Sequence, residues 1–131
     1  MALMDTTFLI DLMSGRERAV DALDALERED EPIAVATTTL QEFYRGLATV
    51  ELSAAEKRRV ADVVKGRPIL PLDARAAERA GQIDAELWAR GEPIDPEDAA
   101  VAGIALSHDE VLVTRRVREF SRVPGLRLRP Y

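Results

Sequence analysis

The sequence contains no cysteine, and this absence excludes two kinds of site. Without thiols the chain can form neither disulfides nor thiolate metal centres, a composition that suits the reducing cytoplasm. No apolar run approaches the roughly 18 residues that a membrane-spanning helix needs, and no basic segment followed by an apolar one opens the chain. We therefore expect a cytoplasmic protein with no membrane segment.

A positive net charge is also missing. The formal net charge is −6 at pH 7, which argues against a protein that holds nucleic acid through bulk electrostatics. The charge is uneven, however: residues 115–131 carry six arginines and one acid, whereas the first 114 residues carry 12 bases and 23 acids. Two interpretations of the basic segment stay open. Arg127 and Arg129 are outward positions of a final strand, or the segment contacts phosphates.

What the sequence does contain is the composition of a globular domain. Of its 131 residues, 47% are hydrophobic and 32% are charged, so wholesale disorder is not expected. The length suits a single domain over residues 1–131, which is enough chain to bury one core. No internal repeat, low-complexity tract or linker divides it.

Short apolar segments alternate with segments of helical periodicity along the chain. The expected strands cover residues 2–4, 33–36, 68–72, 111–114 and 126–130. The expected helix caps are Thr39 with Glu42, Ser53 with Glu56, Asp73, and Asp95 ahead of Pro96. This alternation predicts an α/β protein whose mostly parallel sheet is covered by helices on both faces.

Three acidic residues are expected at the carboxyl edge of this sheet, where open α/β sheets bind their ligands. Asp5 follows the first strand, Glu42 lies in the first turn of the helix after the second, and Asp98 begins the helix before the fourth. Converging carboxylates repel one another unless a cation neutralises them. Oxygen ligands without His or Cys favour Mg²⁺ or Mn²⁺, and such ions can activate water for attack on a phosphodiester.

Each acid also has a purely structural interpretation. Glu42 has the spacing of a capping-box partner of Thr39. Asp98 lies three residues after its expected N-cap, Asp95, where the helix dipole favours negative charge. Asp5 is harder to explain in this way, because a carboxylate there is expected to cap at most one short turn. For Glu42 and Asp98, the spacing alone leaves helix cap and metal ligand open.

Five segments fall in the order and spacing of a known family. They are MDTTFLIDLM (4–13), TTTLQEFYRG (37–46), GEPIDPEDAAVAGIAL (91–106), LVTRRVREF (112–120) and VPGLRLRPY (123–131). Together they resemble PIN-domain ribonucleases, and most closely the VapC toxins of toxin–antitoxin modules. The resemblance spans essentially the whole chain. It implies a three-layer α/β/α sandwich with strand order 3-2-1-4-5, a Mg²⁺- or Mn²⁺-dependent endoribonuclease, a VapB-type antitoxin as partner, and a homodimer.

The resemblance also implies roles by position. Asp5, Glu42 and Asp98 would form the acidic metal-binding and catalytic set, with Asp5 and Asp98 as direct ligands and Glu42 as a ligand or water-orienting group. Thr6 and Thr114 would hydrogen-bond these carboxylates. The basic residues that would contact the RNA substrate are Arg115, Arg116 and Arg118.

The sequence departs from the family's pattern at one position. The family usually has Asp or Asn two residues after the threonine of the VT motif, where this chain has Arg116. An arginine there would favour a single metal ion, or contact a phosphate, or point to solvent while Glu119 or Asp95 supplies the missing charge. Two hypotheses follow. The chain is an endoribonuclease in which bound water attacks RNA in line, or it is a degenerate, non-catalytic PIN fold that binds RNA or protein.

Overall fold

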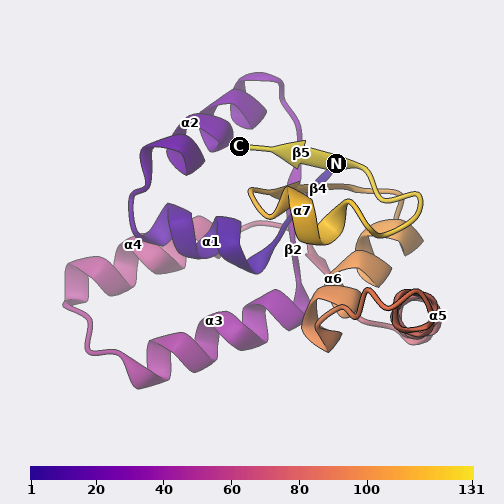
Figure 1. Ribbon diagram of the computed structural model, residues 1–131. Coiled ribbons are helices and arrows are strands. Elements are labelled where there is room, and N and C mark those ends of the chain that lie inside the picture. The colour runs from indigo at the N-terminus through magenta and orange to yellow at the C-terminus, as the bar shows by residue number, and fades with distance from the viewer.

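The computed structural model describes the backbone of residues 1–131 and every side chain except that of Val60. A five-stranded sheet runs through the molecule (Figure 1). Neighbouring strands are parallel, in the order β3-β2-β1-β4-β5. The strands are β1 (Ala2–Met4), β2 (Ile33–Ala36), β3 (Ile69–Leu70), β4 (Val111–Thr114) and β5 (Leu128–Pro130). The predicted strand order is therefore confirmed, and the sheet is parallel throughout.

Seven helices connect the strands of the described chain. They are α1 (Thr6–Met13), α2 (Glu17–Arg28), α3 (Thr37–Thr49), α4 (Ala54–Val64), α5 (Ala74–Ala89), α6 (Pro96–Ser107) and α7 (Val117–Phe120). Three of the predicted caps are confirmed, because the side chains of Ser53, Asp73 and Asp95 each accept a hydrogen bond from a backbone amide of the following turn. None of the described helices is both long and apolar enough to cross a membrane.

The fourth predicted cap, Thr39 with Glu42, is wrong. Helix α3 starts at Thr37 with Ala36 at the N-cap position, three residues before the predicted N-cap. Pairing with β3 holds β2 extended up to Ala36, and the chain enters the helix at once. Thr39 is therefore fully buried inside the helix. Glu42 lies in its second turn, where it caps nothing.

Two strands are shorter than predicted. Strand β3 has only two residues because Pro68 and Pro71 flank it, and proline has no amide hydrogen to donate to a sheet ladder. Strand β5 begins at Leu128, two residues late. A turn centred on Gly125 precedes it, with a positive φ of 78° that favours glycine.

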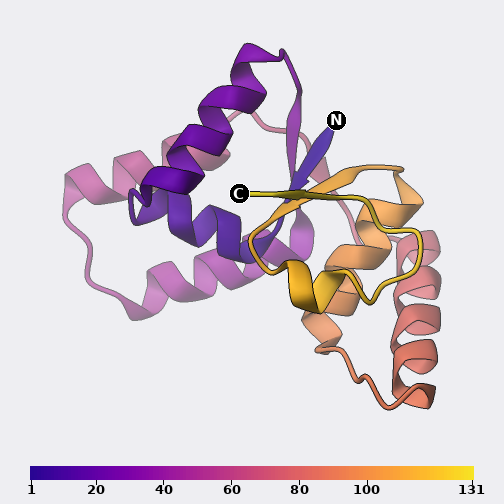
Figure 2. The ribbon, with the colours of Figure 1, turned by 45° about the horizontal axis from the view of Figure 1, so that its top comes forward.

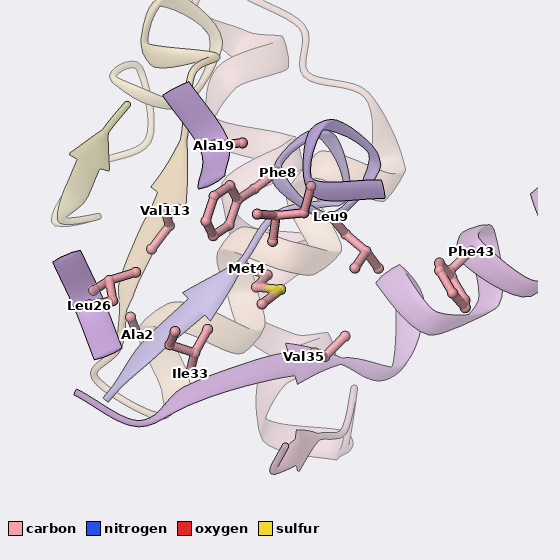
Figure 3. Close-up of a cluster of buried hydrophobic side chains, with 11 residues drawn as sticks. Ala2, Met4, Phe8, Leu9, Ala19, Leu26, Ile33, Val35, Phe43 and Val113 are labelled. Atoms are coloured by element: carbon pink, nitrogen blue, oxygen red, sulfur yellow. The ribbon is translucent and has the colours of Figure 1, made fainter. Parts of the chain in front are cut away.

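Alternate residues of the strands face opposite sides of the sheet, and this alternation builds two cores. Ala2 and Met4 of β1 pack with Val35 of β2 on the face that helices α1 to α4 cover (Figure 3). Leu3 and Ala34 face the other side and pack against α5, α6 and α7. The result is the predicted three-layer α/β/α sandwich, with the two groups of helices on either side of the sheet (Figure 2).

Helices α5 and α6 approach each other closely at Gly103. A Cβ atom added there would lie 2.6 Å from the carbonyl oxygen of Ala76 and 2.9 Å from the Cβ of Ala80. Most neighbours of Gly103 on α6 are alanines, so small side chains let the two helices pack at short range. This contact fixes α6, whose first turn carries Asp98.

Replacing Gly103 with alanine is expected to lower the free energy of unfolding by about 1–3 kcal/mol, because the new methyl group meets backbone atoms that cannot move aside. Gly81→Ala in α5 is the matched control, since a Cβ at Gly81 has nothing within 4 Å. That control should be stabilising by about 0.5–1 kcal/mol. Urea denaturation followed by circular dichroism measures both. Equal effects of the two substitutions would contradict the close packing.

Candidate active site

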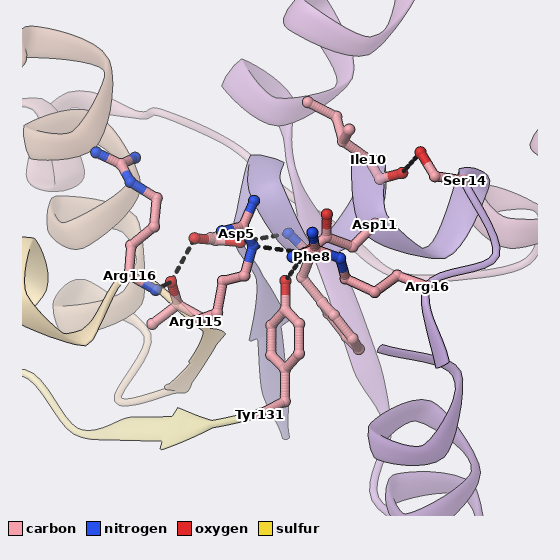
Figure 4. A network of polar contacts seen from close by, with 10 residues as sticks. Asp5, Phe8, Ile10, Asp11, Ser14, Arg16, Arg115, Arg116 and Tyr131 are labelled. Atoms are coloured by element: carbon pink, nitrogen blue, oxygen red, sulfur yellow. Dashed lines mark hydrogen bonds and ion pairs between the residues drawn. The ribbon is translucent and has the colours of Figure 1, made fainter. Parts of the chain in front are cut away.

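The side chain of Asp5 lies where the carboxyl ends of β1 and β4 meet. It is 2% exposed, and both of its oxygens are hydrogen-bonded. Oδ1 accepts from the backbone amide of Phe8 at 2.7 Å (Figure 4), and Oδ2 accepts from the hydroxyl of Thr114 at 2.5 Å. Burial raises the pKa of Asp5, although these two hydrogen bonds oppose the rise.

Asp5 is also the N-cap of helix α1. The expectation that a cap at this position would serve at most one short turn was wrong, because α1 has eight residues. Capping through Oδ1 accounts for one oxygen of the carboxylate. The second oxygen faces Thr114 at the end of β4, so the predicted contact between these residues is present.

Asp98 lies in the first turn of α6 and pairs with Arg116. Its Oδ1 accepts from Nη1 and its Oδ2 from Nη2 of the guanidinium, each at 2.8 Å. The cap of α6 is made by Asp95, whose side chain accepts from the amide of Glu97. Asp98 does not make this cap, and its carboxylate faces Arg116, two residues beyond the end of β4. Of the three interpretations of Arg116, the one that directs it to solvent is wrong.

Glu42 faces the same region from α3. Burial, followed by the negative charge of the neighbouring Glu97, raises the pKa of Glu42 from 4.5 to about 7. The hydroxyl of Thr6 opposes this rise. Sequence reasoning missed Glu97. Its only signal was the acidic run Asp95-Pro96-Glu97-Asp98, in which each acid fits the start of a helix.

These side chains line one pocket of about 190 Å³, here called the acidic pocket. Its charged lining residues are Asp5, Glu42, Asp95, Glu97, Asp98 and Arg116. The structure thus brings together Asp5, Glu42 and Asp98, the three acids singled out in the sequence, although they are far apart in the chain. Thr6 lines the same pocket. Five acids around one arginine leave the pocket with a surplus of negative charge.

The donor chemistry of the acidic pocket suits a hard divalent ion. Its candidate ligands are carboxylates, which Mg²⁺ and Mn²⁺ prefer, and burial is the main cause of the raised pKa values of Asp5 and Glu42. In the described residues, no three His, Cys, Asp or Glu side chains are grouped closely enough to hold an ion. Asp98 has both oxygens on Arg116, so binding an ion there would require this pair to open.

A family model for the PIN domain matches residues 2–126. The chain belongs to the PIN-domain family. Among curated proteins, this PIN domain is 40% identical over 100 residues to the tRNA(fMet)-specific endonuclease VapC of Salmonella typhimurium, covering 73% of each chain. It is 28% identical over 125 residues to ribonuclease VapC2 of Haemophilus influenzae, covering 95% of this chain and 93% of the other.

Solved structures give the same fold. VapBC2 from Rickettsia felis, bound to a DNA fragment from its promoter, superposes with a TM-score of 0.88 at 21% identity, covering 99% of this PIN domain and 98% of that chain. DNA-bound VapBC from Salmonella typhimurium superposes with a TM-score of 0.79 at 31% identity and the same coverage. Both superpositions extend over essentially the whole PIN domain.

A second buried acid, Asp11 of α1, fixes the C-terminus of the PIN domain and was missed in the sequence. It is 5% exposed, and its Oδ2 accepts hydrogen bonds from Arg115 Nε and the Tyr131 hydroxyl, each at 2.8 Å (Figure 4). The Tyr131 ring packs on Phe8 with centroids 4.7 Å apart. Burial, then the contact with Asp11, raises the pKa of Tyr131. No sequence signal links residues 120 positions apart.

The basic C-terminal segment is mostly paired with acids of the PIN domain. Arg129 makes two hydrogen bonds to Glu29, at 2.7 and 2.8 Å, and Arg127 bonds the backbone and side chain of Asp109. These contacts favour the interpretation that the two arginines belong to the final strand and its edge over the interpretation that the segment contacts phosphates. Arg129 lies within β5, and Arg127 directly precedes it. Of the predicted RNA contacts, Arg115 and Arg116 are engaged by acids, whereas Arg118 is exposed.

An apolar groove of about 660 Å³ opens beside the acidic pocket, between α1, α3 and the start of α6. Its apolar lining includes Leu9, Ile10, Met13, Leu47, Val50 and Leu52. Ile10 is 51% exposed and Val50 is 56% exposed. Glu42 and Glu97 line both the groove and the acidic pocket, so a ligand lying in the groove would reach the acids.

In metal-free protein, Glu42→Gln is expected to stabilise the fold at pH 8 more than at pH 5. Because the pKa of Glu42 is raised in the folded protein, the unfolded chain releases this proton at a lower pH than the folded protein does. Wild type therefore loses stability as pH rises from 4.5 through about 7, and glutamine cannot ionise. The gain at pH 8 should be on the order of 1 kcal/mol, because solvent screens the half-exposed group.

Urea denaturation of both proteins at the two pH values measures this difference. Glu51→Gln is the control, since Glu51 is an exposed acid outside the acidic pocket. A gain for Glu42→Gln that is the same at pH 5 and pH 8 would contradict the electrostatic account of the pocket.

Proposed function

We propose that this PIN domain is a Mg²⁺- or Mn²⁺-dependent endoribonuclease and acts as the toxin of a VapBC-type toxin–antitoxin module in the cytoplasm. The observation that carries the proposal is the convergence of Asp5, Glu42 and Asp98 in one pocket at the carboxyl edge of the sheet. Relatives named as VapC ribonucleases, 28% to 40% identical, support the reaction class.

Asp5 and Asp98 would hold the ion, with Glu42 and Glu97 close by. A bound Mg²⁺ or Mn²⁺ would neutralise the carboxylates, activate water and stabilise charge on the phosphate. Thr114 keeps Asp5 in place through its hydroxyl. Glu42 is suited to orient the attacking water and accept its proton, because burial brings its pKa near neutrality. Attack of the water oxygen on phosphorus breaks the bond to O3′, leaving a 5′-phosphate and a 3′-hydroxyl.

The second candidate is a degenerate PIN fold that binds RNA or protein without cutting. The Arg116–Asp98 ion pair is the observation that favours it, since one of the two best candidate ligands already has a cation on both oxygens. The five carboxylates that line the pocket favour the nuclease, because a binding module has no need to gather acids around a site for a polyanion.

We propose a VapB-type antitoxin as the partner, because several solved relatives are VapBC complexes. The apolar groove offers a surface for an apolar segment of that partner, and it leads into the acidic pocket, where a basic side chain would find acids. A homodimer is also proposed. The side chain of Trp88 on α5 is 74% exposed, and it offers an aromatic contact for such an interface.

Asp5→Asn and Asp98→Asn are each expected to reduce RNA cleavage in the presence of Mg²⁺ or Mn²⁺ by more than about 100-fold, because even residues that only support metal ligands cost 10–100-fold. Gel analysis of cleaved RNA measures this, with circular dichroism to verify folding. Glu78→Gln, an exposed acid of α5, should cleave like wild type. Wild-type rates in both aspartate variants would refute the site, and an inert wild type would favour the binding module.

The same assay tests the partner. A VapB-type protein encoded beside this gene should stop cleavage by wild type. Val50→Glu places a charge in the apolar groove outside the acidic pocket, and it should keep the cleavage rate while weakening the inhibition. Unchanged inhibition of Val50→Glu would mean that the antitoxin binds elsewhere.

A further inference from the structure

We propose that Arg116 is an internal competitor of the divalent ion. Its guanidinium holds both oxygens of Asp98, and an ion binds this carboxylate only by displacing it. The inference rests on the proposed function, because it takes Asp98 as a metal ligand. It goes further because it assigns to Arg116 a role in setting the affinity of the site for the divalent ion.

The contact has the geometry of a strong ion pair. Two parallel hydrogen bonds of 2.8 Å join the guanidinium to the carboxylate, an arrangement that arginine makes and lysine cannot. The Asp98 side chain is 15% exposed and that of Arg116 is 33% exposed, so solvent screens this pair less than one at the surface. A metal ion would need at least one of the same oxygens.

Arg116 makes further contacts with residues that neighbour it in the sequence. Its backbone amide donates to Thr114 Oγ1 at 2.9 Å, and the same threonine hydroxyl donates to Asp5. The guanidinium carbon lies 5.5 Å from the centroid of the buried Phe120 ring, a cation–π contact. The guanidinium is therefore ordered within the pocket by several contacts, unlike a mobile surface arginine.

Among the described residues, Arg116 is the one basic residue that lines the acidic pocket. Arg115 pairs with Asp11 outside it, and Arg122 donates to the backbone carbonyls of Glu92 and Pro93. Competition for Asp98 is therefore assigned to one side chain. Because five acids still outnumber one arginine, the pocket keeps its attraction for a divalent ion, and the effect of Arg116 is to weaken binding rather than to abolish it.

The test is calorimetric titration of Mn²⁺ into metal-free protein, which does not depend on catalysis. Arg116→Ala removes the competitor without adding a ligand and should bind Mn²⁺ about tenfold more tightly than wild type. Arg116→Lys keeps the charge but loses the paired hydrogen bonds, so its affinity should lie between the two. Arg118→Ala, which alters an exposed neighbour outside the pocket, should match wild type.

A second comparison ties the effect to Asp98. In an Asp98→Asn background, Arg116→Ala should no longer change the affinity as it does in wild type, because the contested carboxylate is gone. If wild type and Arg116→Ala bind Mn²⁺ equally, competition by Arg116 is refuted while the metal site stands. If neither binds Mn²⁺, the metal-dependent function and the competition are both refuted. Weaker binding by Arg116→Ala would also overturn the inference.

Discussion

The burial and mutual repulsion of carboxylates at one edge of the sheet are the constraint on which this site depends. The negative charge of each acid is compensated in a different way. Asp5 gives one oxygen to the start of α1 and the other to Thr114, and Asp98 has Arg116. At Glu42, burial and the negative charge of Glu97 outweigh the opposing Thr6 hydroxyl and raise the pKa to about 7. The unbalanced charge that results is what a divalent ion would relieve.

The fold supplies this arrangement through a few long-range contacts. Parallel pairing of β1 with β4 brings the two strand ends together, and this pairing places Thr114 beside Asp5. The close approach of α5 and α6 at Gly103 fixes the helix that presents Asp98. At the C-terminus, the hydrogen bond from the Tyr131 hydroxyl to Asp11 holds the chain against α1. Packing far from the acidic pocket thus decides where its carboxylates lie.

Much of the fold followed from local pattern in the sequence. Apolar segments and caps such as Ser53 and Asp73 mark their elements, because the hydrogen bonds involved span only a few residues. The strand order came from the family resemblance and not from the pattern. The Thr39 cap failed because strand pairing, which is a tertiary effect, decides where α3 begins.

The three main acids of the candidate site could be predicted from the sequence, but the side chains that they contact could not. Asp5, Glu42 and Asp98 were found because topology places strand ends together. Asp11 and Glu97 were missed, since their importance depends on side chains that approach only in the folded molecule. The same holds for the ion pair between Arg116 and Asp98. These residues are 18 positions apart, and no local sequence pattern predicts that they pair.

The most direct measurement is anomalous X-ray diffraction from crystals of this protein soaked in Mn²⁺. If the acids are gathered to hold a divalent cation, a strong manganese peak will lie between the carboxylates of Asp5 and Asp98, with Arg116 turned away from Asp98. A map without a manganese peak in the pocket at saturating Mn²⁺, with the guanidinium still on Asp98, would contradict the account.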